Sequence, residues 1–563
     1  MIASLPPGLL LIVAALAIPV LPDAARRAWT VVVPAAGLWA LIALEPGNYL
    51  AFAWFGAEFQ PVRVDKLSLV FGYIFHIAAI IAAIYALHVR DSVQHMAGMV
   101  YAGSGIGAVF AGDLVTLFVY WEAMAVASVF LVWARGGEAA YRSGMRYLIV
   151  QIASGVLLLS GAILQAEQTG SIAFDRMDLG NLATWLIFLA FGIKCAFPFL
   201  HNWLQDAYPE ATVTGTVFLS AFTTKAAVYA LARGFPGTEM LIYVGAAMTA
   251  FPIFYAVIEN DLRRVLAYSL NNQLGFMVVG VGIGTPMALN GAAGHAFAHI
   301  LYKALLFMSM GAVLYRVGTI KGSELGGLYK SMPLTTVFCI VGAASISAFP
   351  LFSGFIAKAL TLSAVAYEGY VVVWLILMFA SAGVFHHSGI KIPYFAFFAH
   401  DSGKRCKEAP LNMLVAMGIA AFLCIALGVW SPALYGILPY DLDYEPYTPT
   451  HVIGQLQLLM FSALAFAVLI RYRIYPPELK STNLDFDWVY RKGVPALIAR
   501  CWPALWAAWQ GLLGAFQGGL RQGIDAVIRL AGPEGTLART WPLGSTTLWV
   551  AVLLGGFLLI YYL

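Results

Sequence analysis

A series of long apolar runs constrains this chain more than any other feature. About sixteen runs of roughly 17–25 residues follow one another, and each is long enough to cross a bilayer as a helix. Only 11% of the 563 residues are charged, where a soluble protein has roughly 25%. A water-soluble core could not bury this much apolar surface. We therefore expect an all-α integral membrane protein with about 14–16 transmembrane helices.

Loops and changes in composition divide the chain into six segments. We expect an N-terminal three-helix segment, two repeats of about five helices each, further C-terminal helices, an amphipathic helix and a last span. These segments are residues 1–94, 95–234, 235–400, 401–480, 481–540 and 541–563.

Lysine and arginine residues fall mainly in alternate loops. Cytoplasmic loops carry an excess of these residues, so the richer set of loops marks the inner side. The poorer set contains Arg63, Lys66, Arg176 and Arg233, beside acids such as Asp441. This bias predicts a multi-pass protein of a bacterial inner membrane with both termini on the outer, periplasmic side.

The segment 481–540 differs from the membrane spans in composition. It mixes tryptophan and leucine with regularly spaced basic residues, such as Arg500, Arg521 and Arg529. This pattern is typical of a helix that lies in the inner membrane interface with its basic face toward lipid headgroups. The alternative is an ordinary loop helix packed on the membrane domain. A lateral helix of this length could brace neighbouring helices or a partner subunit.

Five lysines and one glutamate fall within the predicted spans. Each charge at the centre of a bilayer costs roughly 2.5–3.5 kcal/mol even on the mildest scale, so such residues usually serve a function. Lys391 could instead snorkel from a helix end to the membrane surface. The set consists of Glu122, Lys194, Lys225, Lys303, Lys358 and Lys391.

Glu122 and Lys194 are the natural pair for proton transfer. Burial disfavours the charged form of a lysine, whereas a nearby carboxylate favours it. A lysine that gains and loses a glutamate partner can therefore load and release a proton. The alternative is a static ion pair that locks two helices together.

Prolines predict two interrupted helices, each beside a buried lysine. Pro198 follows Lys194, and Pro350 and Gly354 precede Lys358. Proline lacks an N–H group and clashes with the preceding turn, which frees backbone polar groups inside the membrane. Packing kinks are the alternative. Two copies with an odd number of spans would be inverted relative to each other, as in many transporters.

His295, His299 and Lys303 form one polar stripe, because their spacing places them on one face of a helix. The stripe predicts a proton or water wire between the repeats, and packing histidines are the alternative. We expect no metal, because no carboxylate accompanies the histidines and Lys303 would repel a cation. The five cysteines form no CxxC motif and no Walker A sequence occurs, so we expect no cofactor.

Five motifs in order resemble the antiporter-like proton-channel family. This family includes the D-type subunit of the Mrp sodium/proton antiporter and the large membrane-arm subunits of respiratory complex I. The motifs are "WEAMAVAS", "GIKCAFPFLHNWLQDAYPEATVTGTVFLSAFTTKAAVYAL", "NDLRRVLAYSLNNQLGFM", "HAFAHILYKALLFMSMGAVLY" and "FPLFSGFIAK". The resemblance implies two inverted five-helix repeats, each with one broken helix, around a hydrated axis.

By motif position, the resemblance also implies roles for single residues. Glu122 and Lys194 match the family's glutamate–lysine pair, and Lys225 matches its next-helix lysine. Lys303 and Lys358 match the relay and exit lysines of the second half. The family often has a histidine where Tyr208 stands, which is a departure from the pattern.

These observations predict a cation/proton translocating subunit of a multi-subunit Mrp-type Na⁺/H⁺ antiporter, without catalytic chemistry of its own. The alternatives are a proton-pumping subunit of a complex I-like or hydrogenase-like redox complex, and a membrane subunit that energises inorganic carbon uptake. The expected partners are other membrane subunits, protons with Na⁺ as the candidate coupled ion, and lipid headgroups at the lateral helix. We expect no nucleic acid partner.

Overall fold

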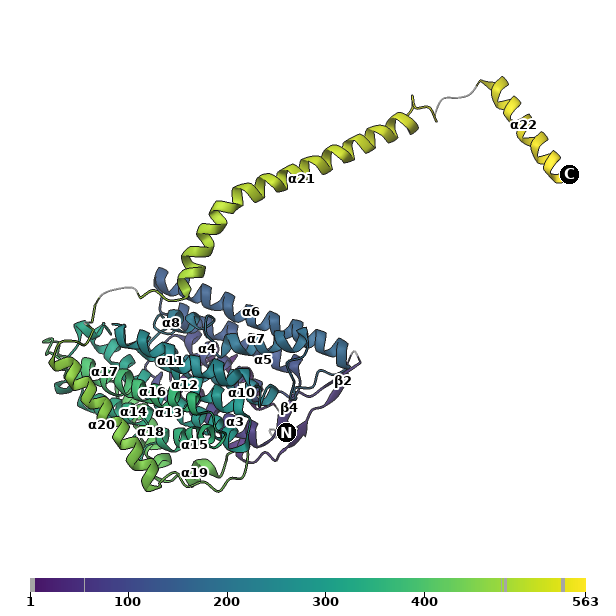
Figure 1. The fold of residues 1–563 in the computed structure, drawn as a ribbon. Coiled ribbons are helices and arrows are strands. Elements are labelled where there is room, and N and C mark those ends of the chain that lie inside the picture. The colour runs from purple at the N-terminus through teal and green to yellow at the C-terminus, as the bar shows by residue number, and fades with distance from the viewer. Residues whose placement is uncertain (1–5, 55, 477, 480–482, 538–541) are drawn as a thin grey trace. The chain divides into compact units, whose positions relative to one another are not determined.

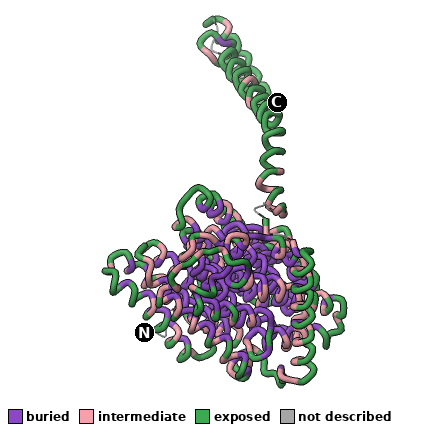
Figure 2. The backbone as a smooth tube through the Cα atoms, turned by 90° about the vertical axis from the view of Figure 1, so that its left-hand side faces the viewer, coloured by how far each residue is buried: buried purple, intermediate pink, exposed green. Residues whose placement is uncertain are grey.

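The computed structural model describes residues 1–563 except for 1–5, 55, 477, 480–482 and 538–541 (Figure 1). Contacts divide the chain into two units, Met1–Asn483 and Leu484–Leu563. The first unit is a helical bundle with a continuous buried interior, and its exposed residues lie mainly on the outside (Figure 2).

The helices of the first unit follow the predicted apolar runs closely. Those before the second predicted repeat are α1 (Pro7–Ala15), η2 (Ile18–Val20), α2 (Asp23–Ile42), α3 (Lys66–Tyr85), α4 (Ser92–Phe110), α5 (Leu114–Trp133), α6 (Gly137–Thr169), α7 (Leu182–Lys194), α8 (Asn202–Ala207), α9 (Gly215–Ala221) and α10 (Thr223–Gly234). Those that follow are α11 (Met240–Ile258), α12 (Leu262–Ile283), α13 (Pro286–Val317), η3 (Gly322–Glu324), η4 (Leu328–Lys330), α14 (Pro333–Ile346), α15 (Ser353–Tyr367), α16 (Val371–Val384), η5 (Phe385–Ile390), α17 (Lys391–Pro393), η6 (Tyr394–Phe398), α18 (Leu411–Val429), α19 (Pro432–Tyr435) and α20 (Pro449–Arg471).

The prediction of a helical membrane fold is confirmed. Within the described residues, ten helices are long and apolar enough to cross a bilayer, and four shorter apolar helices accompany them. Among the longest is α13, which is buried almost throughout. Helix α12 is too polar to be counted among these ten helices, yet nearly all of its residues are buried inside the bundle.

Four short strands lie in the loop before α3, where no regular structure was predicted. Strand β1 (Gly47–Tyr49) pairs with β4 (Val62–Val64), and β2 (Phe52–Trp54) pairs with β3 (Ala57–Phe59), both antiparallel. Asp65 then caps α3 and accepts hydrogen bonds of 2.8 and 2.6 Å from Arg233. Burial acts to raise the pKa of the Asp65 carboxyl, but Arg233 outweighs it and holds the pKa below its ordinary value.

Two helices are broken at the predicted places, and the two breaks share one backbone pattern. Ala196 and Phe199 have φ angles of 61° and 70°, and Ala348 and Leu351 have φ angles of 57° and 74°. These left-handed conformations are costly for residues with a side chain, and such strain is found mainly at functional sites. Pro198 and Pro350 stand immediately before the second strained residue of each break. The shared pattern supports an internal repeat.

Further interruptions were not predicted from the sequence. Phe222 separates α9 from α10, with φ and ψ angles of −97° and −65°. The π-helices η5 and η6 flank Lys391, where one continuous span was predicted. Wide π-turns are frequent at functional sites.

The second unit contains η7 (Val489–Gly493), α21 (Val494–Ala531) and α22 (Leu543–Tyr562). Helix α21 is 38 residues long and has no buried residue, which agrees with the predicted long amphipathic helix. Its exposed apolar residues recur at helical spacing and include Leu505, Trp509, Leu512 and Phe516.

Candidate functional site

Lys194 is the last residue of α7, directly before the first break, and its side chain is fully buried. Its ammonium group donates a 2.5 Å hydrogen bond to the carbonyl oxygen of Trp121 on α5 and lies 4.5 Å from the centre of the Trp121 ring. The Trp121 indole is fixed in turn by a 2.9 Å bond to Ser154. The charge is therefore held by a carbonyl and an aromatic face.

Glu122 adjoins this site without forming an ion pair. Its charge interacts electrostatically with Lys194, but within the described residues no basic group lies within 4.0 Å of its carboxylate. One carboxylate oxygen, Oε1, is buried and has no hydrogen-bond partner among those residues. The carboxylate rests against Gly155 of α6, where an added Cβ atom would lie 1.6 Å from Oε1. This geometry does not support a static ion pair, and it leaves both groups free to change partners.

Lys225 lies in the first turn of α10, just after the interruption at Phe222. Its ammonium donates a 2.6 Å hydrogen bond to the carbonyl oxygen of Ser220 and a 3.1 Å bond to the hydroxyl of Thr224. The Ser220 carbonyl is available because the helix is interrupted. This break therefore supplies a carbonyl oxygen to Lys225, as the second predicted break does to Lys358.

The polar stripe on α13 runs through the buried centre of the bundle. His295 Nε2 lies 3.1 Å from Gln273 and 3.0 Å from the hydroxyl of Tyr302, which itself donates to Gln273. Farther along the stripe, both ring nitrogens of His299 and the ammonium of Lys303 lack a hydrogen-bond partner in the described part of the chain. Unpaired buried polar groups are costly, and they are typical of sites where water or a proton is transferred.

Lys358 lies on α15, after the second break. Its ammonium donates a 2.8 Å hydrogen bond to the carbonyl of Ile346, the last residue of α14. Gly354 permits this close packing, because an added Cβ would lie 1.8 Å from the carbonyl oxygen of Ser345. A cavity of about 370 Å³ adjoins Lys358 and is also lined by His451 and Gln455 of α20.

The two break lysines occupy different positions relative to their breaks. Lys194 precedes the first break, whereas Lys358 follows the second, and Ile346 takes the place that corresponds to Lys194. Lys194 and Lys358 are therefore not equivalent residues of the two breaks.

Electrostatic interactions connect the buried groups into one row. The charge of Lys225 acts on His299 and Lys303, and that of Lys358 acts on His295 and Lys303. His387 of η5 extends the row, because Lys303, Lys358 and Lys391 all act on it. Sequence reasoning missed His387, although the pair "HH" within an apolar run was a visible signal.

Lys391 lies at the membrane face where α11 ends and α12 begins. Its ammonium contacts three carbonyl oxygens at the end of α11 and lies 3.0 Å from Glu478 Oε1. Glu478 follows α20 and was not singled out from the sequence. Burial raises the pKa of the Glu478 carboxyl above its ordinary value, while Lys391 opposes this effect. Lys391 is fully buried, so it does not snorkel to the surface.

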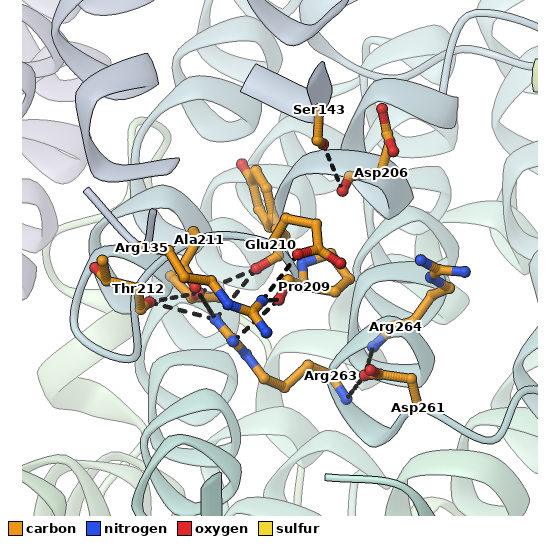
Figure 3. Close-up of polar contacts among 12 residues, drawn as sticks. Arg135, Ser143, Asp206, Pro209, Glu210, Ala211, Thr212, Asp261, Arg263 and Arg264 are labelled. Carbon is orange, nitrogen blue, oxygen red and sulfur yellow. Dashed lines mark hydrogen bonds and ion pairs between the residues drawn. The ribbon is translucent and has the colours of Figure 1, made fainter. Parts of the chain in front are cut away.

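Arginines at this same face hold the loop that follows the first break (Figure 3). The buried Arg263 of α12 donates to the carbonyls of Tyr208, Pro209 and Ala211 at 3.1–3.2 Å. Arg135, beyond the end of α5, donates to Pro209 and forms a 3.1 Å ion pair with Glu210. A helix of the second predicted repeat thus fixes a loop of the first. We call this side of the bundle the arginine face.

Tyr208 has a structural contact at the position where the resembling family often has a histidine. Its hydroxyl donates a 2.6 Å hydrogen bond to the carbonyl oxygen of Leu219, and the side chain is fully buried. Elsewhere in the described residues, no group of three or more histidine, cysteine, aspartate or glutamate side chains is placed to hold a metal ion.

The fold and the site define a class: a polytopic helical membrane protein with two broken helices and a buried row of amines between them. The family model described as "NADH:quinone oxidoreductase/Mrp antiporter, TM" matches residues 111–433, more than half of the chain, so this chain belongs to that family.

Relatives with sequence similarity come from several kinds of complex. Hydrogenase-4 component B of Escherichia coli is 26% identical over 65% of this chain and 62% of its own length. The D-type subunit of the Na⁺/H⁺ antiporter of Alkalihalophilus pseudofirmus is 30% identical over 52% of this chain and 64% of its own length. The chain thus spans less than two thirds of either relative.

Solved structures share the fold. A chain of the Mrp complex from Dietzia sp. DQ12-45-1b superposes with a TM-score of 0.76 at 24% identity, over 92% of this chain and 62% of the other. A chain of the archaeal membrane-bound sulfane sulfur reductase superposes with a TM-score of 0.71 at 22% identity, over 99% of both chains.

Proposed function

We propose that this chain is a cation/proton translocating membrane subunit of a multi-subunit complex of the Mrp Na⁺/H⁺ antiporter type. One observation carries the proposal: Lys225, Lys303 and Lys358 are buried in one electrostatically connected row, Lys194 is buried where the charge of Glu122 acts on it, and no carboxylate lies within 4.0 Å of any of these lysines in the described chain. Buried amines held only by carbonyls, hydroxyls and aromatic rings can exchange protons without first breaking an ion pair.

The proposed route begins at Glu122, which biases the proton occupancy of Lys194 from across a short gap. From Lys194 the proton passes to Lys225, and then to His299 and Lys303 on α13. His295, held by Gln273 and Tyr302, orients the adjoining part of the stripe. Water between these groups would complete each transfer, because histidines and amines exchange protons through single waters.

The exit of the route is Lys358, and the cavity beside it carries the proton onward. His451 lies at the start of α20, on the side of the bundle away from the arginine face, and it lines this cavity with Lys358. By the distribution of basic residues, the arginine face is cytoplasmic in a bacterial inner membrane, and both termini lie on the periplasmic side. Protons would therefore leave through this cavity toward the periplasm.

The segment boundaries remain part of the proposal. Residues 95–234 and 235–400 would be inverted repeats, flanked by residues 1–94 and 401–480, with 481–540 as the lateral helix and 541–563 as the last span. The shared backbone pattern of the two breaks supports this division. The basic residues of α21 would face lipid headgroups.

Two other assignments use the same site. Similarity to a hydrogenase component supports a proton-pumping subunit driven by redox partners. A membrane subunit that energises inorganic carbon uptake would need the same proton route. In each case the other membrane subunits would supply the driving force, and Na⁺ would be the coupled ion only in the antiporter. Neighbouring genes that encode further Mrp-type subunits would favour the antiporter.

Glu122→Gln tests the route. The complex would be expressed with its neighbouring subunits, and proton uptake into inverted vesicles would be measured by quenching of a pH-sensitive dye. We expect at least a roughly ten-fold loss of transport with normal assembly on native gels, because the neutral amide no longer biases Lys194.

Glu138→Gln at the exposed start of α6 is the matched control, because Arg142 at the surface is the one ion-pair partner of Glu138 among the described residues. This control should transport normally. Unchanged transport in Glu122→Gln would contradict the route, and loss of assembly would favour a structural role for Glu122.

A further inference from the structure

Four oxygen atoms surround the ammonium of Lys391, although an ammonium group has only three N–H donors. The carbonyl oxygens of Ala256, Val257 and Glu259 lie 3.2, 2.7 and 2.6 Å from Nζ, and Glu478 Oε1 lies 3.0 Å away. The carbonyls belong to the last turn of α11 and the residue after it. They have no helical partner, and they lie at the negative end of the helix dipole. We call these four atoms the Lys391 cage.

Among the described residues, the cage carries more negative than positive charge. Glu478 and Glu259 both act electrostatically on Lys391. Glu259 accepts hydrogen bonds only from neutral groups, namely the backbone N–H groups of Asn260 and Asp261 and the amide of Asn483. Glu478 Oε2 is buried and has no hydrogen-bond partner within the described part of the chain. Two carboxylates therefore share one ammonium.

In the described chain, Glu478 and Glu259 are the charged groups that act on Lys391, and Arg263 and Arg264 at the start of α12 do not. His386 and His387 of η5 are the titratable groups next to Lys391 on its own helix. Helix α14 also packs against α17, and its sequence contains no charged residue. A buried excess of one negative charge is unfavourable, so the site would gain from a second cation that enters while the Lys391 ammonium stays nearby.

The backbone around Lys391 is irregular. η5 and η6 are π-helices directly before and after α17, and wide turns of this kind are frequent at functional sites. The lysine side chain is a flexible four-carbon stem. The cage also lies at the arginine face, at the end of a helix, so an ion can reach it without crossing the membrane.

We propose that the Lys391 cage is a binding site for a monovalent alkali cation, which takes the place of the lysine ammonium. Carboxylate and backbone carbonyl oxygens are the ligands that hard cations prefer, and carbonyls at helix C-terminal ends coordinate Na⁺ in transporters. This inference rests on the proposed function, because it names the cation site of a cation/proton translocator.

The cage is also connected to the amine row. His387 contacts Ser388, whose hydroxyl donates to Ser269 of α12 at 2.8 Å, and the charges of Lys303 and Lys391 both act on His387. Movement of the Lys391 ammonium would therefore change the electrostatic field at His387 and so along the row that contains Lys303. This arrangement would couple the entry of an ion to the position of a proton.

Lys391→Met tests the site, because it removes the competing ammonium and leaves all four oxygens. The thermal midpoint of the purified complex would be measured in NaCl, KCl and N-methylglucamine chloride at equal ionic strength. We expect sodium or potassium to raise the midpoint of the variant by about 2 °C or more over the organic cation, and the wild type by much less. Comparison of the two salts identifies the preferred ion.

Two further variants make the result specific. Lys391→Met combined with Glu478→Gln should lose the alkali-ion effect. Lys330→Met should behave as the wild type, because Lys330 pairs with Asp401 in an exposed position at the surface. Equal midpoints of Lys391→Met in all three salts would overturn the proposal.

If the complex with Lys391→Met does not assemble, hydrogen exchange of the wild-type complex tests the cation site instead. High NaCl or KCl should slow exchange in peptides that cover residues 254–262 and 385–399, and Glu478→Gln should abolish this change. Identical exchange in all salts would overturn the proposal. These experiments measure ion binding and not transport. If they show no effect of sodium or potassium while Glu122→Gln abolishes transport, the cation site is ruled out and the proton route still stands.

Discussion

Most of the buried lysine side chains in this protein are held by carbonyl and hydroxyl groups and not by carboxylates. The ammonium of Lys194 bonds to a carbonyl, that of Lys225 to a carbonyl and a hydroxyl, and that of Lys358 to a carbonyl. Each of these contacts stabilises a charge less than a buried carboxylate would. The protonated and neutral forms of each amine are therefore closer in free energy than they would be in a buried ion pair, which suits a proton carrier.

Gly155→Ala tests the position of Glu122 without changing any titratable group. The new Cβ would lie 1.6 Å from Glu122 Oε1, so the carboxylate must move away from its place beside Lys194. We expect transport to fall about ten-fold, because a shift of about 1 Å can be costly for a proton-transfer group, while assembly stays normal. Gly180→Ala in the loop before α7 is the control, because no atom lies within 4 Å of the added Cβ. Equal transport in the two variants would show that the position of Glu122 does not matter.

Residue types in the sequence were enough to find the buried amines, because lysine within an apolar run is conspicuous. Their partners were not predictable in the same way. Glu478 lies in a loop far along the chain from Lys391, and only the folded structure brings the two together. Arg263 reads as an ordinary loop arginine, yet it is fully buried against the carbonyls of another repeat.

At the scale of elements, interruptions of helices place the site. The predicted breaks after Lys194 and before Lys358 could be identified because proline marks them. The break at Phe222 has no proline or glycine at the point of interruption. The stretch beside Lys391 does contain Gly389 and Pro393, but these two residues were not used as signals of an interruption. Apolar periodicity alone describes all of these segments as continuous spans. The hairpin strands before α3 were missed because they are only three residues long.

Gly354→Ala tests the second break as an element. Its Cβ would lie 1.8 Å from the carbonyl oxygen of Ser345, and backbone atoms on both sides would have to shift. We expect a loss of about 1–3 kcal/mol in stability, as for other overpacked sites, and a loss of transport through displacement of Lys358. Thermal unfolding and vesicle transport would measure the two effects. Normal stability and normal transport would show that α14 and α15 can move apart at the break without loss of function.

At the scale of the whole molecule, the proton route and the long helix α21 belong to different units. Every residue of the proposed route and of the Lys391 cage lies within Met1–Asn483. The second unit has almost no buried residues of its own, and its apolar side chains are exposed along α21 and α22. Its stability must therefore come from lipid or from partner subunits, as a helix with one apolar face requires.

A chain that ends at Asn483 tests whether the second unit serves assembly and the first unit holds the proton route. The isolated shortened chain should unfold within about 2 °C of the full chain in detergent, because the removed residues contribute nothing to the buried core. Co-expressed with its neighbouring subunits, it should assemble poorly and transport at least about ten-fold less. Phe516→Asp in the full chain should weaken assembly in the same direction, because it places a charge on the exposed apolar stripe of α21. Full assembly and transport by both variants would mean that α21 binds neither partner nor membrane in a way that the complex needs.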